Sequence, residues 1–434
     1  METGKPDEGL LKRKVGLFGA TMSGIGIIVG AGIYVLIGEA VGLAGGIAWL
    51  SFLIAATVAA FTASSYVRMG RRVPKDSPEF QYAKTGLGQR AGFTAGWLML
   101  WAGLISTAAV ALGFGSYLEA FTGFPMVLSA LILVAMLSVV VWIGVQQSIS
   151  FVVVMALVEV LGLLAVIAVG IPHIGDHTLL EAPKGVSGIW AASALVFFAY
   201  IGFEALGNLA EEMRNPQKDL PKAIIWAVVV STILYVLVAI SAVSLIGWRA
   251  LADSSAPMAS AVEIVLGDRG KLILGLVALA STSNTVLLLL FSVSRSVYGM
   301  AQAGALPKFL GTVGRRKTPW VSTLIIWAIA SSFLFIGSVA GVARVTNFST
   351  LISFALVNLS LFVVLRREGS KRSALRIALL SVVPMLGVLS CIWLASRTGW
   401  IAAAVGAGLA LAGFALGQLM WQRGQRMKPG GVKP

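Results

Sequence analysis

The sequence SGIGIIVGAG occupies residues 23–32, inside the first long apolar segment of the chain. A second unusual stretch, FFAYIGFE, lies at residues 197–204 in the sixth apolar segment. Glycine destabilises a helix by about 1 kcal/mol relative to alanine, so these stretches weaken the helices that contain them. Close packing of small residues between membrane helices would explain either stretch alone. Two interrupted segments at matching positions in two halves of a chain instead indicate a transporter site built on an inverted repeat.

The composition indicates a membrane protein. Of the 434 residues, 58% are hydrophobic and 12% are charged. Soluble domains carry about 25% charged residues and cannot bury this much apolar surface around one core. In a bilayer the same side chains face lipid. The sequence therefore predicts an all-α membrane protein and argues against a soluble domain.

A membrane-spanning helix needs about 20 mostly apolar residues. We predict twelve such spans, and an even number places both termini on the same side of the membrane. The predicted spans are residues 16–43, 46–67, 92–118, 126–145, 149–171, 188–210, 223–247, 271–302, 319–341, 347–365, 374–395 and 398–421.

The distribution of positive charge supports this count and sets the orientation. With these spans, 27 of the 33 Lys and Arg residues fall in the two tails and in alternate loops. Cytoplasmic loops carry an excess of Lys and Arg. We therefore expect a multi-pass protein of the cytoplasmic (inner) membrane with both termini cytoplasmic. The net charge of +15 then reflects orientation, and no nucleic acid partner is expected. The six basic residues on the other side are Lys184, Arg249, Arg269, Lys271, Arg344 and Arg397.

Four stretches, in this order and spacing, carry a resemblance to a known family. The chain resembles the amino acid–polyamine–organocation (APC) superfamily, and within it the bacterial and archaeal amino acid permeases and the cationic amino acid transporters. The similarity extends over about residues 15–310. The four stretches are GIGIIVGAGIYVLIG (24–38), FFAYIGFE (197–204), EEMRNPQKDLPKAI (211–224) and SRSVYGMAQAGALP (294–307).

This resemblance implies a five-plus-five inverted repeat with broken first and sixth helices. Two further helices follow at the C-terminus. The corresponding divisions are a cytoplasmic tail (1–14), the first repeat (15–172), an external loop (173–187), the second repeat (188–366), the two extra helices (367–422) and a cytoplasmic tail (423–434).

The resemblance also implies a substrate site at the two interruptions. Backbone N–H groups would bind the substrate carboxylate, and these belong to Gly30, Ala31 and Gly32. Backbone carbonyl groups would receive the substrate amine, and these belong to Ile28, Phe198, Ala199 and Ile201. An aromatic gate would be Phe198 or Phe203, while Glu204 would take part in gating or substrate binding. A structural hydrogen bond that holds the broken helix is the equal alternative for Glu204.

Glu159 lies in the middle of the fifth predicted span, with apolar neighbours on every side. A carboxylate at this depth costs at least about 2.5 kcal/mol, which favours a functional role such as binding and releasing a proton during transport. A permanently protonated Glu in an interhelical hydrogen bond is the alternative. Several proton-coupled relatives carry lysine at this position, so their mechanism does not transfer. The resemblance suggests that Ser283 and Asn284 face Glu159. The carboxylate and hydroxyl oxygens would then suit either a proton or sodium, so the sequence does not decide between these two coupling ions.

The leading hypothesis is a secondary active transporter of amino acids, proton-coupled or exchanging. The chain has no glycine-rich phosphate-binding loop of the ATPase type, so ATP-driven transport by this chain is not expected. Neither enzymatic activity nor a cofactor is predicted; a non-transporting sensor or a channel is the alternative of a different class. We favour a neutral or broad amino acid range over polyamines or cationic amino acids. Candidates for the side-chain pocket are Ser106, Thr107, Asn284 and Ser353.

Three other features are weaker. His173 and His177 are four residues apart in an external loop, but no third ligand follows them, so we do not expect a metal site. The resemblance implies a short amphipathic helix within residues 71–88. Glu211 and Glu212 either close the cytoplasmic side or lie on a solvated surface.

Overall fold

The computed structural model describes residues 15–73, 77–143, 149–206, 213–302, 306–314, 318, 320–368 and 374–426. Within these ranges all named elements are helical, and one isolated parallel β-bridge joins Val15 to Met213. The predicted all-helical class is therefore confirmed for the described part of the chain. Glu211 and Glu212 lie outside it.

The first half of the chain contains seven α-helices and two short 3-10 helices. These are α1 (Leu17–Val29), α2 (Gly32–Ala44), η1 (Gly45–Ile47), α3 (Ala48–Gly70), α4 (Pro78–Leu87), α5 (Gln89–Thr122), α6 (Met126–Ile143), α7 (Ile149–Gly170) and η2 (Ile171–His173). The second half contains α8 (Gly185–Val196), η3 (Phe197–Tyr200), α9 (Pro216–Asp253), α10 (Pro257–Gln302), η5 (Lys308–Gly311), α11 (Trp320–Leu334), α12 (Val339–Glu368), α13 (Ala374–Ala395) and α14 (Trp400–Arg426).

Apolar helices long enough to cross a bilayer confirm a multi-pass membrane protein. In the described residues nine segments qualify by length and composition, and α1, α11 and the Leu379–Ala395 part of α13 are shorter apolar helices. One of the nine, Gly32–Gly70, joins the end of the first predicted span to the whole of the second. The total of twelve spans stays a prediction.

Two of the longest helices change direction at glycines. At 1.5 Å per residue the 46 residues of α10 would greatly exceed the roughly 30 Å of the hydrocarbon core. Gly247 in α9 has φ 74° and Gly267 in α10 has φ 61°, a backbone region that glycine adopts without steric cost. The predicted spans 223–247 and 271–302 respectively end and begin close to these kinks.

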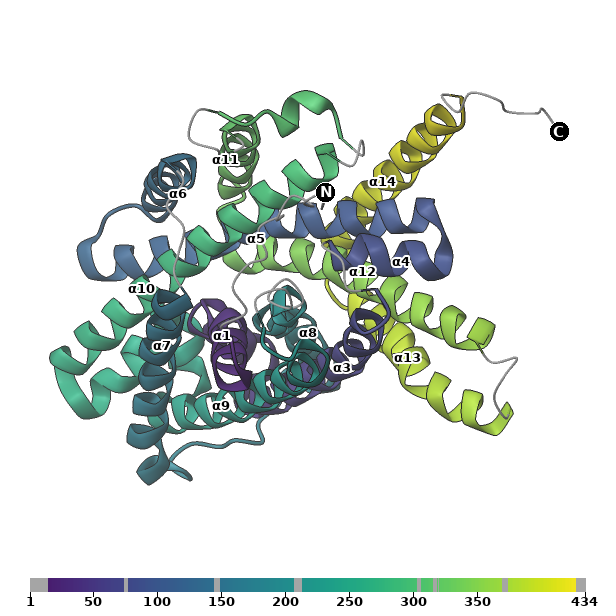
Figure 1. Cartoon of the computed structure of the whole chain (residues 1–434). Helices are drawn as coiled ribbons and strands as arrows, with labels where there is room; N and C mark the ends of the chain where they lie inside the picture. Colours follow the sequence, from purple (N-terminus) through teal and green to yellow (C-terminus); the bar gives the residue numbers. More distant parts are fainter. Residues whose placement is uncertain are drawn as a thin grey trace.

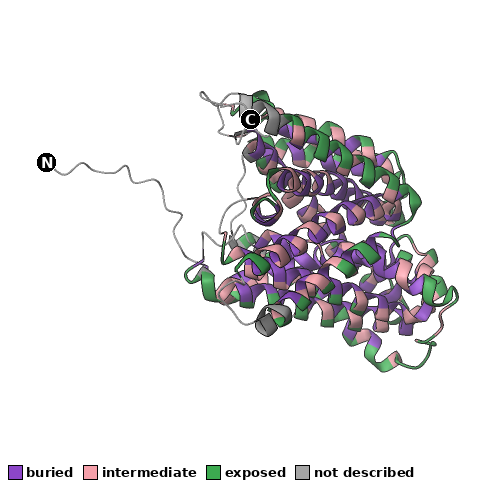
Figure 2. Cartoon of the chain, turned by 90° about the vertical axis from the view of Figure 1, so that its right-hand side faces the viewer, coloured by how far each residue is buried: buried purple, intermediate pink, exposed green. Residues whose placement is uncertain are grey.

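The helices form a bundle around the two interrupted segments. Figure 1 shows α1 and α8 in the middle, with α3, α7 and α9 around them and α5, α10 and α12 on the opposite side. α2 packs against α8 and α9, while α12 packs against α5 and α13. Buried residues fill the interior of the bundle and exposed ones follow its outer faces (Figure 2). The exposed faces of the outer helices are rich in large hydrophobic residues, as expected for contact with lipid.

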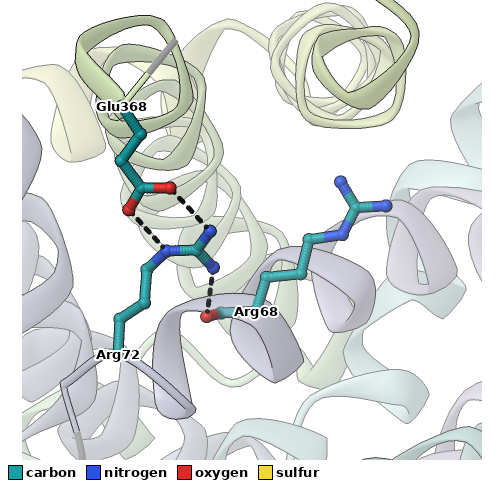
Figure 3. A network of polar contacts seen from close by, with 3 residues as sticks. All are labelled: Arg68, Arg72 and Glu368. Atoms are coloured by element: carbon teal, nitrogen blue, oxygen red, sulfur yellow. Dashed lines mark hydrogen bonds and ion pairs between the residues drawn. The ribbon is translucent and has the colours of Figure 1, made fainter. Parts of the chain in front are cut away.

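An ion pair links the end of α3 to the end of α12. The guanidinium of Arg72 contacts both carboxylate oxygens of Glu368, at 3.0 and 3.1 Å, and also donates to the backbone carbonyl of Arg68 (Figure 3). The two side chains are 29% and 39% exposed, so the pair contributes at most about 1 kcal/mol. Its main effect is to connect two helices that are almost 300 residues apart in the sequence.

Candidate functional site

The first interruption separates α1 from α2. α1 ends at Val29 and α2 begins at Gly32; Gly30, with φ 16° and ψ −145°, leaves the helical path, whereas Ala31 already has helical dihedral angles. The glycines here permit close approach: a Cβ on Gly32 would lie 2.6 Å from the Cα of Ala199 in η3. No side chain caps the N-terminus of α2. Its first N–H groups and the positive end of the helix dipole therefore form a place suited to a carboxylate.

The second interruption follows α8. The helix tightens into η3, then Ile201 is extended and Gly202 has φ 129°, a conformation that L side chains rarely adopt. A Cβ on Gly202 would lie 2.7 Å from the Ile27 side chain. A carboxylate oxygen of Glu204 accepts a hydrogen bond from the Gly202 N–H at 2.8 Å. This contact is a hydrogen bond that holds the interrupted helix, which is the structural role named above as the alternative for Glu204.

The two interruptions meet at Tyr235 of α9. Its hydroxyl oxygen lies 2.7 Å from the carbonyl oxygen of Ile28 and 2.9 Å from that of Ala199. A hydroxyl has a single proton and can donate to only one of these carbonyls at a time. The structure thus brings together two carbonyl groups that the resemblance implies for the substrate amine. An ammonium group, with three donors, can satisfy both at once.

The other carbonyl and aromatic candidates have different surroundings. The Phe198 carbonyl accepts a hydrogen bond from the N–H of Ile201 at 3.2 Å, closing the η3 turn. The Phe198 side chain packs against an apolar cluster that contains Ala31. Phe203 is fully buried, with its ring centroid 5.6 Å from that of Tyr66 and 5.4 Å from that of Phe354. Of the two predicted gates, Phe198 therefore packs with the first interruption and Phe203 lies among aromatic rings of α3 and α12.

Glu159 of α7 is completely buried. The side chains of Ser281 and Asn284 from α10 lie next to its carboxyl group. Among the described residues, both carboxyl oxygens, the Ser281 hydroxyl and the Asn284 amide oxygen lack a hydrogen-bond partner of good geometry. Ser283, which we predicted beside Glu159, donates instead to the Leu279 carbonyl of its own helix at 2.7 Å. Asn284 thus lies beside Glu159, and the second α10 side chain beside it is that of Ser281.

Helix geometry explains why Ser281 accompanies Asn284. Residues three apart lie on the same face of a helix, whereas adjacent residues point in different directions. Three-residue spacing in the segment ALASTSN would have predicted Ser281 once Asn284 was chosen. Tyr235 was also missed, although it is the one aromatic side chain carrying a hydroxyl group in the predicted span 223–247.

The surroundings of Ala31 and Phe198 are apolar. They share a cluster with Ile105 and Ala108 of α5 and Val286 of α10. Two hydroxyl groups expected in the side-chain pocket are already used within the protein, because those of Thr107 and Ser353 donate to the backbone carbonyls of Gly103 and Ala95. Ser106 is buried on α5.

The short amphipathic helix implied by the resemblance within residues 71–88 corresponds to α4, although residues 74–76 lie outside the described part of the chain. Glu79 in its first turn is buried, and the Tyr66 hydroxyl of α3 donates to its carboxyl oxygen at 2.9 Å. Burial raises the pKa of Glu79 above the usual value for a carboxyl group.

The external histidines do not face each other. His173 contacts the carboxylate of Asp176 at 2.9 Å, and the His177 ring packs against Gly247. In the described part of the chain no three His, Cys, Asp or Glu side chains are grouped as metal ligands would be.

Comparisons with known proteins agree with the resemblance. The amino acid permease family matches residues 19–414. The chain is 30% identical to the branched-chain amino acid permease BcaP of Bacillus subtilis, over 90% of this chain and 89% of that protein. It is 28% identical to the methylthioribose transporter of the same organism, over 88% of each chain. It is 29% identical to the vacuolar cationic amino acid transporter 4 of Arabidopsis thaliana, over 82% of this chain and 63% of that protein.

The family match spans both interruptions, Tyr235 and Glu159, and the relatives are transporters rather than enzymes. The chain is a multi-pass membrane protein of the amino acid permease family, within the amino acid–polyamine–organocation superfamily.

Proposed function

We propose that the protein is a secondary active transporter that moves an amino acid across the cytoplasmic membrane by alternating access. The observation that carries this proposal is the meeting of the Ile28 and Ala199 carbonyls, 2.7 and 2.9 Å from one hydroxyl oxygen. Non-helical backbone at membrane depth is tolerated only where protein buries it or where it lines a cavity. Carbonyl groups from two interrupted helices, turned to one point, suit the binding of an amine.

The substrate carboxylate binds the N–H groups of Ala31 and Gly32 at the start of α2, and that of Gly30 once it releases the Gly26 carbonyl, to which it donates at 3.1 Å. The ammonium group binds the carbonyls of Ile28 and Ala199 and replaces the Tyr235 hydroxyl there. Among the other residues proposed for the site, the carbonyl groups of Phe198 and Ile201 complete the amine site once η3 adjusts, and the rings of Phe198 and Phe203 act in gating.

The substrate side chain is apolar. The residues of α5 and α10 that share an apolar cluster with Ala31 and Phe198 are uncharged, and the α10 group beside Gly30 is the neutral hydroxyl of Thr285, so a cationic side chain would lack a carboxylate partner among them. Glu204, an acid close to the second interruption, already accepts a hydrogen bond from Gly202. One relative is a branched-chain amino acid permease. Leucine, isoleucine and valine are therefore the first substrates to test, ahead of cationic amino acids and polyamines.

Glu159 couples transport to an ion. Its buried carboxyl oxygens lie beside the Ser281 hydroxyl and the Asn284 amide, and among the described residues neither carboxyl oxygen has a hydrogen-bond partner of good geometry. A charge on a carboxyl group buried in this way is costly, and a bound proton removes it, which favours proton coupling. Sodium at the same oxygens and obligatory exchange are the alternatives that the experiment below separates.

The topology proposed for this function keeps the twelve spans of the sequence analysis. It places the first repeat at residues 15–172, the second at 188–366 and both termini in the cytoplasm. The interruptions after α1 and after α8 stand at matching positions of the two repeats, as alternating access through an inverted repeat requires.

Reconstituted liposomes test these proposals. Uptake of labelled amino acids is measured with an inward proton gradient, with a sodium gradient and with neither, for the wild-type protein and Glu159→Gln. We expect proton-stimulated leucine uptake that the variant loses. Sodium-stimulated uptake would identify sodium as the coupling ion in place of the proton. Uptake only into vesicles preloaded with another amino acid would indicate exchange. Folded protein that neither binds nor moves any amino acid in the panel would contradict the proposal.

A further inference from the structure

A groove of about 430 Å³ runs between α3, α8 and α13, on the outside of the bundle. Its walls include Ile54 and Phe61 of α3, Trp190 of α8, and Leu389 and Trp393 of α13. The volume falls within the range of small-molecule sites. None of the residues proposed for amino acid binding or coupling lines it.

The groove requires an apolar occupant. Its two hydroxyl groups are satisfied within their own helices, because Thr57 donates to the Leu53 carbonyl at 2.9 Å and Ser390 to the Gly387 carbonyl at 3.2 Å. Leu389 is 58% exposed although it points into an apolar depression. In a membrane-spanning part of the protein, this surface faces hydrocarbon chains rather than water.

One end of the groove carries a positive charge. Trp190 and Trp393 meet edge to face there, with ring centroids 5.7 Å apart. The guanidinium of Arg397, one turn beyond Leu394, lies 4.3 Å above the Trp393 ring. Arg397 is exposed, and among the described residues it forms no ion pair with a carboxylate. Tryptophan beside a cation is typical of the level of the lipid headgroups.

An apolar groove with a cation at one end matches an anionic amphiphile. We propose that the groove binds an acyl chain of an anionic phospholipid, whose phosphate contacts Arg397. Lipid tails already surround the protein, so the chain gains little from leaving bulk lipid. Selection among lipids must therefore come from the headgroup, and Arg397 is the group that provides it.

The bound lipid would connect α13 to the half-helix that leads into the second interruption. α8 continues directly into η3, whose Ala199 carbonyl faces Tyr235. A ligand that binds the folded protein and not the unfolded chain stabilises it, by an amount that rises with the logarithm of its concentration relative to Kd. Phosphatidylglycerol should therefore raise the melting temperature.

The test measures binding of dioleoyl-phosphatidylglycerol and dioleoyl-phosphatidylcholine to the purified full-length protein by native mass spectrometry and by thermal shift in detergent. We expect wild-type protein to prefer phosphatidylglycerol. Arg397→Gln should weaken its binding about fivefold, because a basic side chain at a lipid surface contributes about 1 kcal/mol. Arg269→Gln, an exposed basic residue on another helix, is the matched control and should leave binding unchanged.

Filling the groove gives a second, independent variant. Leu389→Trp should abolish the preferential binding of phosphatidylglycerol, while Leu164→Trp, on an exposed face of α7, should not. Gel filtration shows whether each variant is folded. If Leu389→Trp does not fold, Arg397→Gln still tests the proposal. Inorganic phosphate alone should give no thermal shift. Equal binding of the two lipids, or no difference between Arg397→Gln and Arg269→Gln, would overturn the proposal.

Discussion

Tyr235→Phe removes one oxygen atom from the point where the two interrupted helices meet. The change leaves the Ile28 and Ala199 carbonyls without the hydroxyl that lies 2.7 and 2.9 Å away. Loss of a donor to buried acceptors costs about 1–3 kcal/mol. At roughly 2 °C per kcal/mol for a large chain, the substrate-free variant should melt about 2–6 °C below wild type.

Leucine should change this difference. In the proposed complex the ammonium group provides the donors that Phe lacks, so the bound variant loses less stability than the free one. The increase in melting temperature on adding leucine should therefore be larger in Tyr235→Phe than in wild type. Differential scanning fluorimetry of purified protein, with and without a leucine titration, measures both quantities.

The control is Tyr117→Phe. This buried tyrosine of α5 also donates to a backbone carbonyl, that of Tyr34 at 3.0 Å, but it does not contact the carbonyls at Tyr235. It should lower the melting temperature without enlarging the leucine shift. The reasoning is refuted if Tyr235→Phe melts like wild type, or if its leucine shift is smaller, since a smaller shift would mean that the hydroxyl joins the substrate instead of giving way to it.

Three further changes have defined outcomes. Gly32→Ala places a Cβ 2.6 Å from the backbone of η3, so leucine uptake should fall at least tenfold, whereas Gly408→Ala, with nothing within 4 Å, should transport normally. Glu79→Gln should make stability less dependent on pH: burial raises the pKa of Glu79, the folded state binds more protons, and wild-type stability should fall as pH rises through that pKa. A melting temperature that falls more steeply with rising pH in the variant than in wild type would contradict this. Glu368→Gln should lower the free energy of unfolding by less than about 1 kcal/mol, because its ion pair with Arg72 is partly exposed. High salt should reduce this difference from wild type. A loss of several kcal/mol in chemical denaturation would contradict this estimate.

The repeated apolar segments made the membrane class predictable. Hydrocarbon excludes unpaired backbone polar groups, so long apolar stretches have to be helical, and this holds whatever their neighbours are. The glycines at residues 24–32 and 202 also indicated correctly where helices break. In the structure Gly202 has a positive φ and a Cβ at Gly32 would collide with Ala199, which explains why glycine occupies both positions.

The partners across the bundle were not predictable in the same way. The choice between Ser281 and Ser283 beside Glu159 depended on the rotation of α10, which packing against its neighbours decides. Tyr235 reads in the sequence as an ordinary aromatic residue of a lipid-embedded helix. Only the approach of α9 to both interruptions places its hydroxyl between the two carbonyl groups.

The sequence by itself determined the class, the family and the two points at which helices are interrupted, because these depend on local backbone preferences and on the transfer of side chains into lipid. The tertiary structure alone decided which oxygen atoms meet at Tyr235 and at Glu159, and which faces of α3, α8 and α13 leave a groove beneath Arg397. These features depend on side chains far apart in the chain, whose distances are set by how the helices rotate and pack against one another.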